Sequence, residues 1–389
     1  MKKKKVLILG STGSIGRSTL NVIEKNKKHF NILGLSTNKN IYKILRQANK
    51  YNVKNLIIYN KKSFLKLKKL TINKSIKVFN NFETFIKKNK FKIDYTIIGI
   101  SGFHGLDPTI KVIPHTKNLS SANKESIICG WKFINSQLKK YKTNFIPIDS
   151  EHFSIWSLIQ NGNKDEISKI YLTASGGPFL KKKLKDIKNV SIKDVINHPN
   201  WRMGPKISTD SATMMNKIFE LIEASKLFNI DINKFEIIIH PKSYIHAIVV
   251  YNNGLCKIIA HDTSMEIPIF NSFFNNSKIK YYGQNDFKFK LLNGINFLQP
   301  KVKNFPYLKL LKLLKSDDRY FEVMLVLIND FLVKKFLKNE ISFIRMQNIL
   351  FKLLSNSFLK KFYNKKLNTI KELNLFKNKV NKYLIELNL

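Results

Sequence analysis

The stretch Val6-Leu7-Ile8-Leu9-Gly10-Ser11-Thr12-Gly13-Ser14-Ile15-Gly16, near the start of the 389-residue chain, decides the fold. Its four apolar residues are typical of a buried parallel strand, and the glycines that follow lead into a helical stretch from Arg17 to about Asn26. A glycine-rich loop between a first strand and a first helix lets backbone N–H groups approach a pyrophosphate at the helix N-terminus. We therefore favour dinucleotide binding here over a plain tight turn.

The first 150 residues alternate strand-like and helical segments. Strand-like runs recur at 30–35, 55–59, 95–99, 118–120 and 144–148. Such alternation favours a parallel sheet with helices on both faces. We predict an α/β fold whose N-terminal domain, residues 1–149, is a doubly wound sheet of the Rossmann type.

The remainder of the chain changes pattern twice. Residues 150–275 combine strand-like runs at 169–173, 236–240, 247–251 and 255–261 with a helix predicted over 212–228, which is typical of a central α+β catalytic domain. Residues 276–300 are rich in Asn and predict a linker. Leu, Phe, Ile and Lys recur at helical spacing over 301–389 and predict a small helical C-terminal domain.

The segment after the second strand bears on the choice of cofactor. An NAD enzyme places an acid there to hold the ribose 2′-hydroxyl. This chain instead has Ser36-Thr37-Asn38-Lys39-Asn40, which contains hydroxyls, amides and a lysine but no acid. The sequence therefore predicts that the 2′-phosphate of NADPH is accepted.

The net charge of +43, from 69 basic and 26 acidic residues, would ordinarily point to nucleic acid or an anionic membrane surface. The lysines are spread from end to end and accompany heavy use of Asn, Ile and Phe. We interpret most of the charge as compositional drift and expect neither a nucleic-acid nor a membrane partner.

The cysteines and the lengths of the apolar runs bear on where in the cell the protein is located. Cys129 and Cys256 are far apart and lack partners at metal-ligand spacing, so neither a disulfide framework nor a zinc site is indicated. The apolar run after the N-terminal lysines is shorter than the ~7–15 residues of a signal-peptide core, and none reaches the ~20 of a membrane span. We expect a cytoplasmic protein.

Two carboxylates two residues apart stand in Asp149-Ser150-Glu151-His152. In an extended segment, positions i and i+2 face the same way, so Asp149 and Glu151 would converge on one ligand. A hard divalent cation would relieve their repulsion, and oxygen ligands favour magnesium or manganese over zinc. A solvated turn with two exposed acids is the alternative.

Other polar groups follow predicted strands or open a predicted helix. Lys124 follows the fifth strand, where it is either a group that polarises substrate or an ordinary surface lysine. Ser175-Gly176-Gly177-Pro178 is a plausible anion cradle. In the helix that follows Ser208, we expect Asn216, Lys217 and Glu220 to share one face, with Ser211 near the helix start; these residues would hold a phosphate, unless this is simply a capped amphipathic helix.

The loop His198-Pro199-Asn200-Trp201-Arg202-Met203-Gly204 places a tryptophan between a proline and a glycine. Such a residue is either a local packing plug or a lid over a ligand. We predict a lid over about 195–205. His240 and His246 are expected to be structural.

Together, the motifs at 10–16, 122–126, 149–152, 175–179, 198–201 and 206–220 resemble those of the 1-deoxy-D-xylulose 5-phosphate reductoisomerases of the non-mevalonate isoprenoid pathway, in order and spacing. The resemblance implies NADPH as cofactor and Mg²⁺ or Mn²⁺, with Co²⁺ as a further candidate, held by Asp149, Glu151 and Glu220. It implies Lys124, Asp149, Glu151 and His198 as catalytic residues. Residues implied to contact substrate are Lys124, Ser150, Glu151, Ser175, His198, Trp201, Ser211, Asn216, Lys217 and Glu220. Those implied to contact NADPH are Thr12, Gly13, Ser14, Ile15, Lys39, Asn40, Asn123, Lys124, Glu125 and Gly204. A homodimer is also implied.

The chain departs from the family pattern at Asn38, Ala174 and Pro205, and in the segments 262–267 and 327–331. These changes leave the proposed metal ligands intact and bear on rate and on the packing of the C-terminal domain.

The activity implied is the metal-requiring rearrangement of 1-deoxy-D-xylulose 5-phosphate and its reduction to 2-C-methyl-D-erythritol 4-phosphate. Two alternatives stay open at this point. An NADP-dependent semialdehyde or sugar-phosphate dehydrogenase would use the same first domain but would not need three converging carboxylates. A basic nucleic-acid-binding protein would show salt-sensitive binding to any polyanion.

Overall fold

The computed structural model describes residues 2–72, 75–89, 92–160, 162–275, 278–282 and 292–387. The chain forms two compact units. The first unit contains residues 1–126, 133–153 and 265–287, and the second contains 127–132, 154–264 and 288–389. Part of the predicted linker, 276–277 and 283–291, lies outside the described residues.

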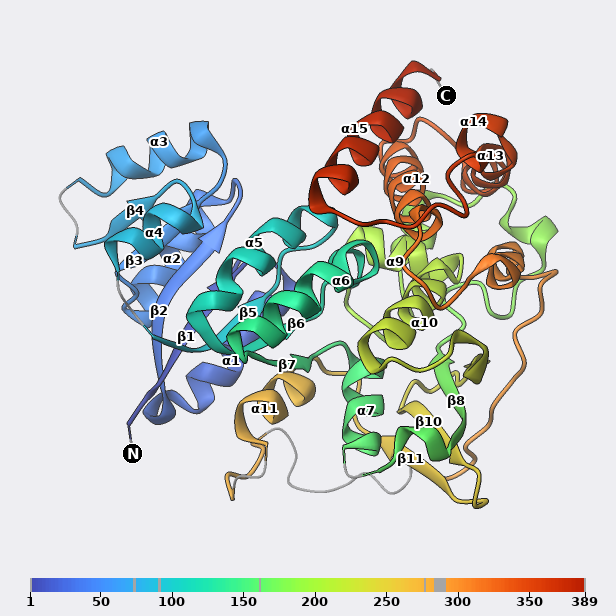
Figure 1. Cartoon of the computed structure of the whole chain (residues 1–389), viewed down its shortest axis with the longest axis horizontal. Helices are drawn as coiled ribbons and strands as arrows, with labels where there is room; N and C mark the ends of the chain where they lie inside the picture. The colour runs from blue at the N-terminus through green and yellow to red at the C-terminus, as the bar shows by residue number, and fades with distance from the viewer. Residues whose placement is uncertain are drawn as a thin grey trace. The chain divides into compact units, whose positions relative to one another are not determined.

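The first unit is built on a seven-stranded parallel sheet with the order β4-β3-β2-β1-β5-β6-β7 (Figure 1). The strands are β1 (Lys4–Leu9), β2 (Phe30–Thr37), β3 (Asn55–Ile58), β4 (Lys77–Phe79), β5 (Ile93–Ile98), β6 (Thr116–Ser121) and β7 (Asn144–Pro147). Val6 to Leu9 have no exposed surface, as a central strand covered on both faces requires. The predicted doubly wound α/β sheet is confirmed.

Helices cover both faces of this sheet (Figure 1). They are α1 (Ser14–Lys25), α2 (Ile41–Tyr51), α3 (Lys61–Leu70), α4 (Phe82–Lys88), α5 (Leu106–Val112), α6 (Lys124–Tyr141) and α11 (Glu266–Phe274). Helix α11 comes from a stretch that the sequence pattern assigned to the middle domain. Its residues Phe270, Phe273 and Phe274 pack into the apolar core that Val6 and Ile8 share with α1.

The second unit contains a four-stranded mixed sheet with the order β11-β10-β8-β9. Its strands are β8 (Ile167–Ala174), β9 (Phe235–Ile239), β10 (Ile245–Tyr251) and β11 (Cys256–Ala260). Strands β8 and β9 are parallel, and β10 is antiparallel to both of its neighbours. All four runs predicted from the sequence are therefore strands.

Helices make up the rest of the second unit. They are α7 (Ser150–Ile159), α8 (Ile192–Ile196), α9 (Pro205–Ala212), α10 (Met215–Phe228), α12 (Tyr320–Leu337), α13 (Phe343–Ser355), α14 (Ser357–Lys360) and α15 (Ile370–Glu386), with a 3₁₀ helix over Pro306–Leu313. Helix α7 begins within the first unit, because that unit extends to Phe153. The predicted helical character of the C-terminal region is confirmed.

The helix predicted over 212–228 is wrong at its start. Met214 has a left-handed backbone with φ of 66°, which separates α9 from α10. The hydroxyl of Thr213 bonds to the carbonyl of Asp210 at 3.1 Å and accepts the Met215 N–H at 3.3 Å. Such local side-chain bonds compete with helical continuation.

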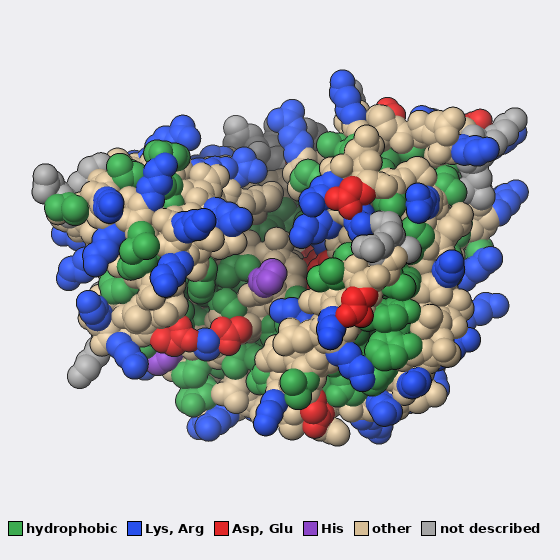
Figure 2. Space-filling model, turned by 90° about the horizontal axis from the view of Figure 1, so that it is seen from above, with side chains coloured by type: hydrophobic (Ala, Val, Ile, Leu, Met, Phe, Trp, Pro, Cys, Tyr) green, Lys and Arg blue, Asp and Glu red, His purple; other side chains and the backbone are tan. Residues whose placement is uncertain are grey.

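Basic side chains are scattered over the face shown in Figure 2 and do not gather into a single stripe. Within the described residues, no helix has both the length and the apolar character needed to cross a membrane.

Candidate active site

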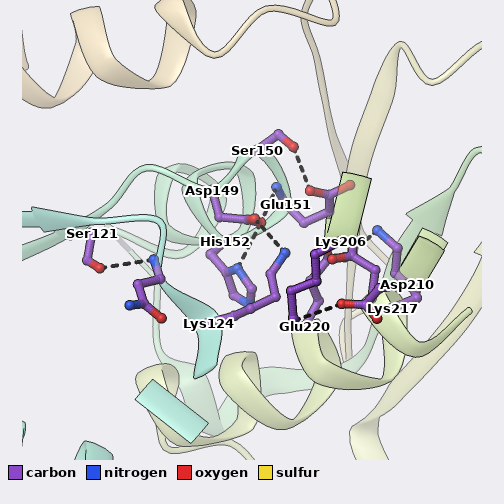
Figure 3. A network of polar contacts seen from close by, with 12 residues as sticks. Ser121, Lys124, Asp149, Ser150, Glu151, His152, Lys206, Asp210, Lys217 and Glu220 are labelled. Atoms are coloured by element: carbon purple, nitrogen blue, oxygen red, sulfur yellow. Dashed lines mark hydrogen bonds and ion pairs between the residues drawn. The ribbon is translucent and has the colours of Figure 1, made fainter. Parts of the chain in front are cut away.

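The first unit places both predicted carboxylates at the start of helix α7 (Figure 3). Asp149 follows β7, and its Oδ1 accepts the backbone N–H of Glu151 at 3.3 Å and contacts Nδ1 of His152 at 3.0 Å. Ser150 donates its hydroxyl to Oε2 of Glu151 at 2.6 Å. The extended geometry predicted for this segment is wrong, because the strand ends at Pro147 and Glu151 lies in the first helical turn. The helix N-terminus favours negative charge there.

Lys124 supplies a buried positive charge beside this pair. It is the first residue of α6, directly after β6 and its following turn, and its Nζ lies 3.2 Å from Oδ2 of Asp149. Lys124 is 8% exposed and Asp149 9% exposed. The alternative that Lys124 is an ordinary surface lysine is therefore wrong. Its ammonium balances the charge of the Asp149 carboxylate.

Asn123 and its neighbours hold the start of α6 in place. Its side-chain carbonyl caps the helix by accepting the Ser126 N–H at 2.9 Å, and its amide donates to the carbonyls of Ile100 and Gly102 at 2.6 and 2.9 Å. The Asn123 N–H in turn donates to the hydroxyl of Ser121 at 3.1 Å. Glu125 is buried. These bonds fix the position of the neighbouring Lys124.

In the second unit, Asn216, Lys217 and Glu220 share one face of α10, as predicted from their spacing. The Asn216 amide donates to Oε1 of Glu220, and the Lys217 ammonium forms an ion pair with the same carboxylate. Glu220 is 1% exposed and Lys217 5% exposed. Ser211 does not start this helix, as the sequence suggested, because it lies in the last turn of α9.

Ser175 and His198 form a second polar pair in this unit. Ser175 follows β8, and its hydroxyl contacts Nε2 of His198 at 2.9 Å while accepting the Gly177 N–H at 3.0 Å. Nδ1 of His198 accepts the N–H groups of Asn200 and Trp201 at 3.2 and 3.0 Å, so the neutral ring carries its proton on Nε2. Burial, reinforced by the charge of Lys217, lowers the pKa of His198 to about 4. His198 is therefore a neutral donor at physiological pH.

The loop between α8 and α9 rests on two stacked histidines. Trp201 is half-buried and meets the ring of His246 edge-on at 6.0 Å, and His246 stacks on His261 at 3.9 Å between ring centroids. Asn200 also anchors the loop by donating to the carbonyl of Pro241 and the hydroxyl of Ser243, both at 2.7 Å. His261 was not singled out from the sequence, since nothing near it in the chain signals a stack.

A buried polar network in the second unit also escaped sequence reasoning. Oδ1 of Asp210 accepts the side-chain amide of Asn329 at 2.7 Å, and Oδ2 lies 2.9 Å from Nζ of Lys206 (Figure 3 shows the lysine contact). Lys206 also pairs with Asp330 at 3.0 Å. The two partners in α12 belong to the altered segment 327–331, which therefore still makes specific contacts.

The dinucleotide loop has the geometry that its glycines predict. Gly10 has φ of +92°, and a Cβ on Gly16 would lie within 2.6 Å of the backbone of Gly10 and Ser11. The Gly10 N–H donates to the hydroxyl of Ser36 at 2.9 Å, and the hydroxyls of Thr12 and Thr37 lie 2.8 Å apart. The loop is thus held against the end of β2, and its first and third glycines allow that close packing.

The donor chemistry of these residues suits a divalent metal. Asp149 and Glu151 are buried carboxylates at a helix N-terminus, and Glu220 is a buried carboxylate on α10. Buried acids require positive charge, which the ammonium groups of Lys124 and Lys217 supply in this structure. Oxygen donors of this kind fit Mg²⁺ or Mn²⁺.

Comparison with known proteins decides the family. A family model described as 1-deoxy-D-xylulose 5-phosphate reductoisomerase matches residues 6–130, and two models of its C-terminal domains match 145–228 and 262–383. The 1-deoxy-D-xylulose 5-phosphate reductoisomerase of Pelagibacter ubique is 52% identical over 352 residues, which are 90% of each chain. This chain belongs to the 1-deoxy-D-xylulose 5-phosphate reductoisomerase family.

More distant members of the reductoisomerase family also match this chain, in sequence and in structure. The enzyme of a Wolbachia pipientis strain is 38% identical over 89% of each chain. A solved structure of the Zymomonas mobilis enzyme in complex with NADPH matches with a TM-score of 0.87 at 29% identity, over 100% of this chain and 99% of that one. Another, in complex with NADPH, fosmidomycin and magnesium, matches with a TM-score of 0.88 at 28% identity over 98% of each chain.

Family membership settles the activity. The chain is an oxidoreductase that converts 1-deoxy-D-xylulose 5-phosphate to 2-C-methyl-D-erythritol 4-phosphate, with NADPH and Mg²⁺ as cofactors. The resemblance inferred from the motifs is confirmed, and the dehydrogenase and nucleic-acid-binding alternatives are not needed to explain the sequence.

Proposed function

We propose that this chain performs the family reaction with Asp149, Glu151 and Glu220 as the ligands of one divalent cation. The support is the burial of all three carboxylates and their oxygen-donor chemistry, which suits a hard divalent cation; Lys124 pairs with Asp149, and Lys217 pairs with Glu220. When bound, the metal supplies Lewis-acid polarisation of adjacent substrate oxygens and a template for their orientation. The candidate metals are Mg²⁺ and Mn²⁺, with Co²⁺ as a further candidate.

Lys124 and Ser150 act at the reacting end of the substrate in this proposal. The Lys124 ammonium donates to a substrate oxygen and balances negative charge that develops there, while its contact with Asp149 holds it in place. The hydroxyl of Ser150 exchanges its bond to Glu151 for a substrate oxygen. Asp149 contacts His152, which holds the carboxylate in its orientation.

The phosphate end is held by neutral and cationic donors of the second unit. Ser175 and His198 donate hydroxyl and Nε2–H groups, Asn216 donates its amide and Lys217 its ammonium, and Ser211 adds a hydroxyl. A neutral His198 suits this role, because it donates a hydrogen bond without competing for protons at physiological pH. Trp201 covers the bound substrate when its loop closes, and water exclusion strengthens these contacts.

The cofactor lies along the loop from Thr12 to Ile15, with Lys39 and Asn40 after β2 and Asn123, Lys124 and Glu125 at the start of α6. Gly204 contributes from the 198–204 loop. The support is the close-packed glycine loop at the N-terminus of α1, where backbone N–H groups would meet a pyrophosphate. The domain division proposed from the sequence assigns these residues, apart from Gly204, to positions 1–149.

The observation that carries this proposal is the buried Asp149, Glu151 and Lys124 group at the carboxyl edge of the parallel sheet. The decisive assay follows NADPH consumption with 1-deoxy-D-xylulose 5-phosphate before and after chelation by EDTA, and after Mg²⁺ is restored. We expect activity to vanish with chelation and return with the metal. Activity that survives exhaustive chelation would refute the metal role.

We also propose a homodimer, located in the cytoplasm. Strand β11 is one edge of its sheet; it carries Ile258, which is 50% exposed, and Leu255, directly before the strand, is 58% exposed. A second copy would cover this apolar edge and pair its open backbone groups. Light scattering of the purified chain should give twice the monomer mass, and Ile258→Lys should shift it toward the monomer. A monomeric wild-type chain at assay concentration would contradict the dimer.

A further inference from the structure

A cavity of about 650 Å³ opens between helices α1 and α2 of the first unit. Three cationic side chains, Arg17, Lys43 and Arg46, line it near the N-terminal turns of the two helices, and Lys50 lies farther along α2. Among the described residues that line the cavity, none is acidic. A cavity with this lining attracts anions and repels cations.

The two arginines act on Lys43. Burial lowers the pKa of Lys43, and the charges of Arg17 and Arg46 lower it further. Lys50 differs, because its ammonium lies 3.7 Å from the carboxylate of Glu24. Among the described residues, no carboxylate forms an ion pair with Arg17 or Lys43 as Glu24 does with Lys50, and a bound anion would provide this compensation.

The cavity is tied directly to the dinucleotide loop. The side chain of Gln47 makes two hydrogen bonds to Ser11, donating to its carbonyl at 2.9 Å and accepting its hydroxyl at 2.8 Å. Nε of Arg17 donates to the carbonyl of Gly13 at 3.3 Å. Helix α2 and Arg17 are thus fixed to the loop that receives the pyrophosphate.

Two hydroxyls of the predicted 2′-phosphate segment, those of Ser36 and Thr37, are buried at the end of β2. The hydroxyl of Ser36 is buried and accepts the Gly10 N–H, and that of Thr37 is buried against Thr12. The side chain of Asn40 caps α2 by accepting the Lys43 N–H at 3.3 Å. Of the predicted 2′-phosphate segment, Lys39 remains as an exposed cation. Additional charge for a dianionic phosphate must come from neighbouring elements.

We propose that Arg17 and Lys43, with Arg46 behind them, bind the 2′-phosphate of NADPH and determine the preference for NADPH over NADH. This inference rests on the dinucleotide site of the proposed function and assigns it residues that the motif analysis did not include. Arg17 adds a planar, permanently charged donor set, and Lys43 adds a point charge at the N-terminus of α2, where an anion is also favoured by the helix dipole.

Isothermal titration of the purified full chain with 2′,5′-ADP and with 5′-AMP separates the 2′-phosphate from the rest of the nucleotide. Arg17→Gln and Lys43→Gln should each weaken 2′,5′-ADP binding by about tenfold, the effect of one charged hydrogen bond, and leave 5′-AMP binding within about twofold. The matched control is Lys50→Gln, which removes one positive charge from the same cavity and should leave both affinities nearly unchanged.

Equal weakening of both nucleotides, or an equal effect of Lys50→Gln, would show long-range attraction only and overturn the proposal. Circular dichroism and NADH-dependent turnover check that the variants remain folded and competent. If either variant fails to fold, the ratio of NADPH to NADH kcat/KM in Arg17→Lys and Lys43→Arg supplies the same test: an unchanged ratio in both overturns the proposal. A wild-type chain that discriminates the nucleotides but does not turn over 1-deoxy-D-xylulose 5-phosphate would refute the proposed function and leave this inference standing.

Discussion

Replacing Asn329 with leucine should destabilise the second unit by about 2–3 kcal/mol, because it removes a buried hydrogen bond to a carboxylate. Asp210 is 2% exposed and Asn329 is 1% exposed, and their side chains meet at 2.7 Å. Asn329→Leu leaves Oδ1 of Asp210 without this donor, while Lys206 at 2.9 Å still balances its charge. The remaining ion pair keeps the cost below the about 3–5 kcal/mol of an uncompensated buried charge.

Urea unfolding gives the free energy, and amide hydrogen exchange in α9 and α12 shows where stability is lost. A matched control is Asn378→Leu, the same substitution at an exposed position of α15, which should stay within about 0.5 kcal/mol of the wild type. In an Asp210→Leu background the same change at Asn329 should cost less, because the carboxylate is gone. Equal effects of the buried and exposed substitutions would refute the idea that this bond fastens α12 to α9.

Four other outcomes are expected. Asp149→Asn, Glu151→Gln and Glu220→Gln should each abolish metal-dependent turnover while NADPH binding, followed by nucleotide fluorescence, stays nearly unchanged; a variant that keeps its activity removes that residue from the ligand set. His198 binds a proton more weakly in the folded chain, with a pKa of about 4 against the ordinary 6.5, so its contribution to stability is complete above about pH 6.5 and is lost as the pH falls toward 4. His198→Gln should therefore reduce the change in unfolding free energy with pH over that window. An unchanged pH dependence would contradict the pKa assigned to His198. Trp201→Ala should lower turnover or substrate affinity much more than stability, and hydrogen exchange of its loop should fall when a substrate analogue and metal bind; equal protection with and without ligand would identify a fixed plug. Binding to a DNA duplex should be weak and disappear at physiological salt, and a sequence-selective complex that persists there would overturn the interpretation of the charge.

The parallel sheet could be predicted from the sequence because its first strand contains a short, continuous apolar run and further strand-like runs alternate with helical segments. Val6 to Leu9 are fully buried, because helices cover both faces of the sheet. A strand buried on both faces is apolar at every position, so it can be recognised from its own sequence without its neighbours. Strand β4 was not predicted, because it has three residues and only Phe79 among them is buried. A three-residue segment carries too little sequence pattern to indicate a strand. Pairing with β3 makes β4 a strand.

The errors near the site have a local cause. Asp149 follows a strand and was assigned extended geometry, but an acid that accepts the N–H two residues later is the usual start of a helix. The break at Met214 is harder to foresee, because methionine seldom adopts positive φ and the hydroxyl bonds of Thr213 that accompany it are seen only in the folded chain. Both errors concern the backbone conformation that was predicted. Neither changes which polar residues were selected as candidates.

Contacts between distant parts of the chain could not be predicted at all. Asn329 and Asp210 are 119 positions apart, and Gln47 and Ser11 are 36 apart. Neither pair carries a periodic or motif signal, so only the folded chain brings the partners together. The network around Asp210 also shows that the altered segment 327–331 keeps two polar contacts to α9, through Asn329 and Asp330.

Burial distinguishes the functional lysines in a chain where composition hides them. The side chain of Lys226 is 6% exposed and pairs with Asp318, whose side chain is 33% exposed. Of the 69 basic residues, Lys124 and Lys217 are the two in the described part of the structure that are buried as whole residues, at 8% and 5% exposure. Each is paired with a buried carboxylate, Asp149 or Glu220, that the sequence marked as a metal ligand. A lysine is rarely buried without a partner, because loss of hydration costs more than surface packing returns. The two buried lysines therefore stand beside the carboxylates to which the chemistry is assigned, whereas the lysines assigned to the cofactor, Lys39 and Lys43, are accessible to a ligand.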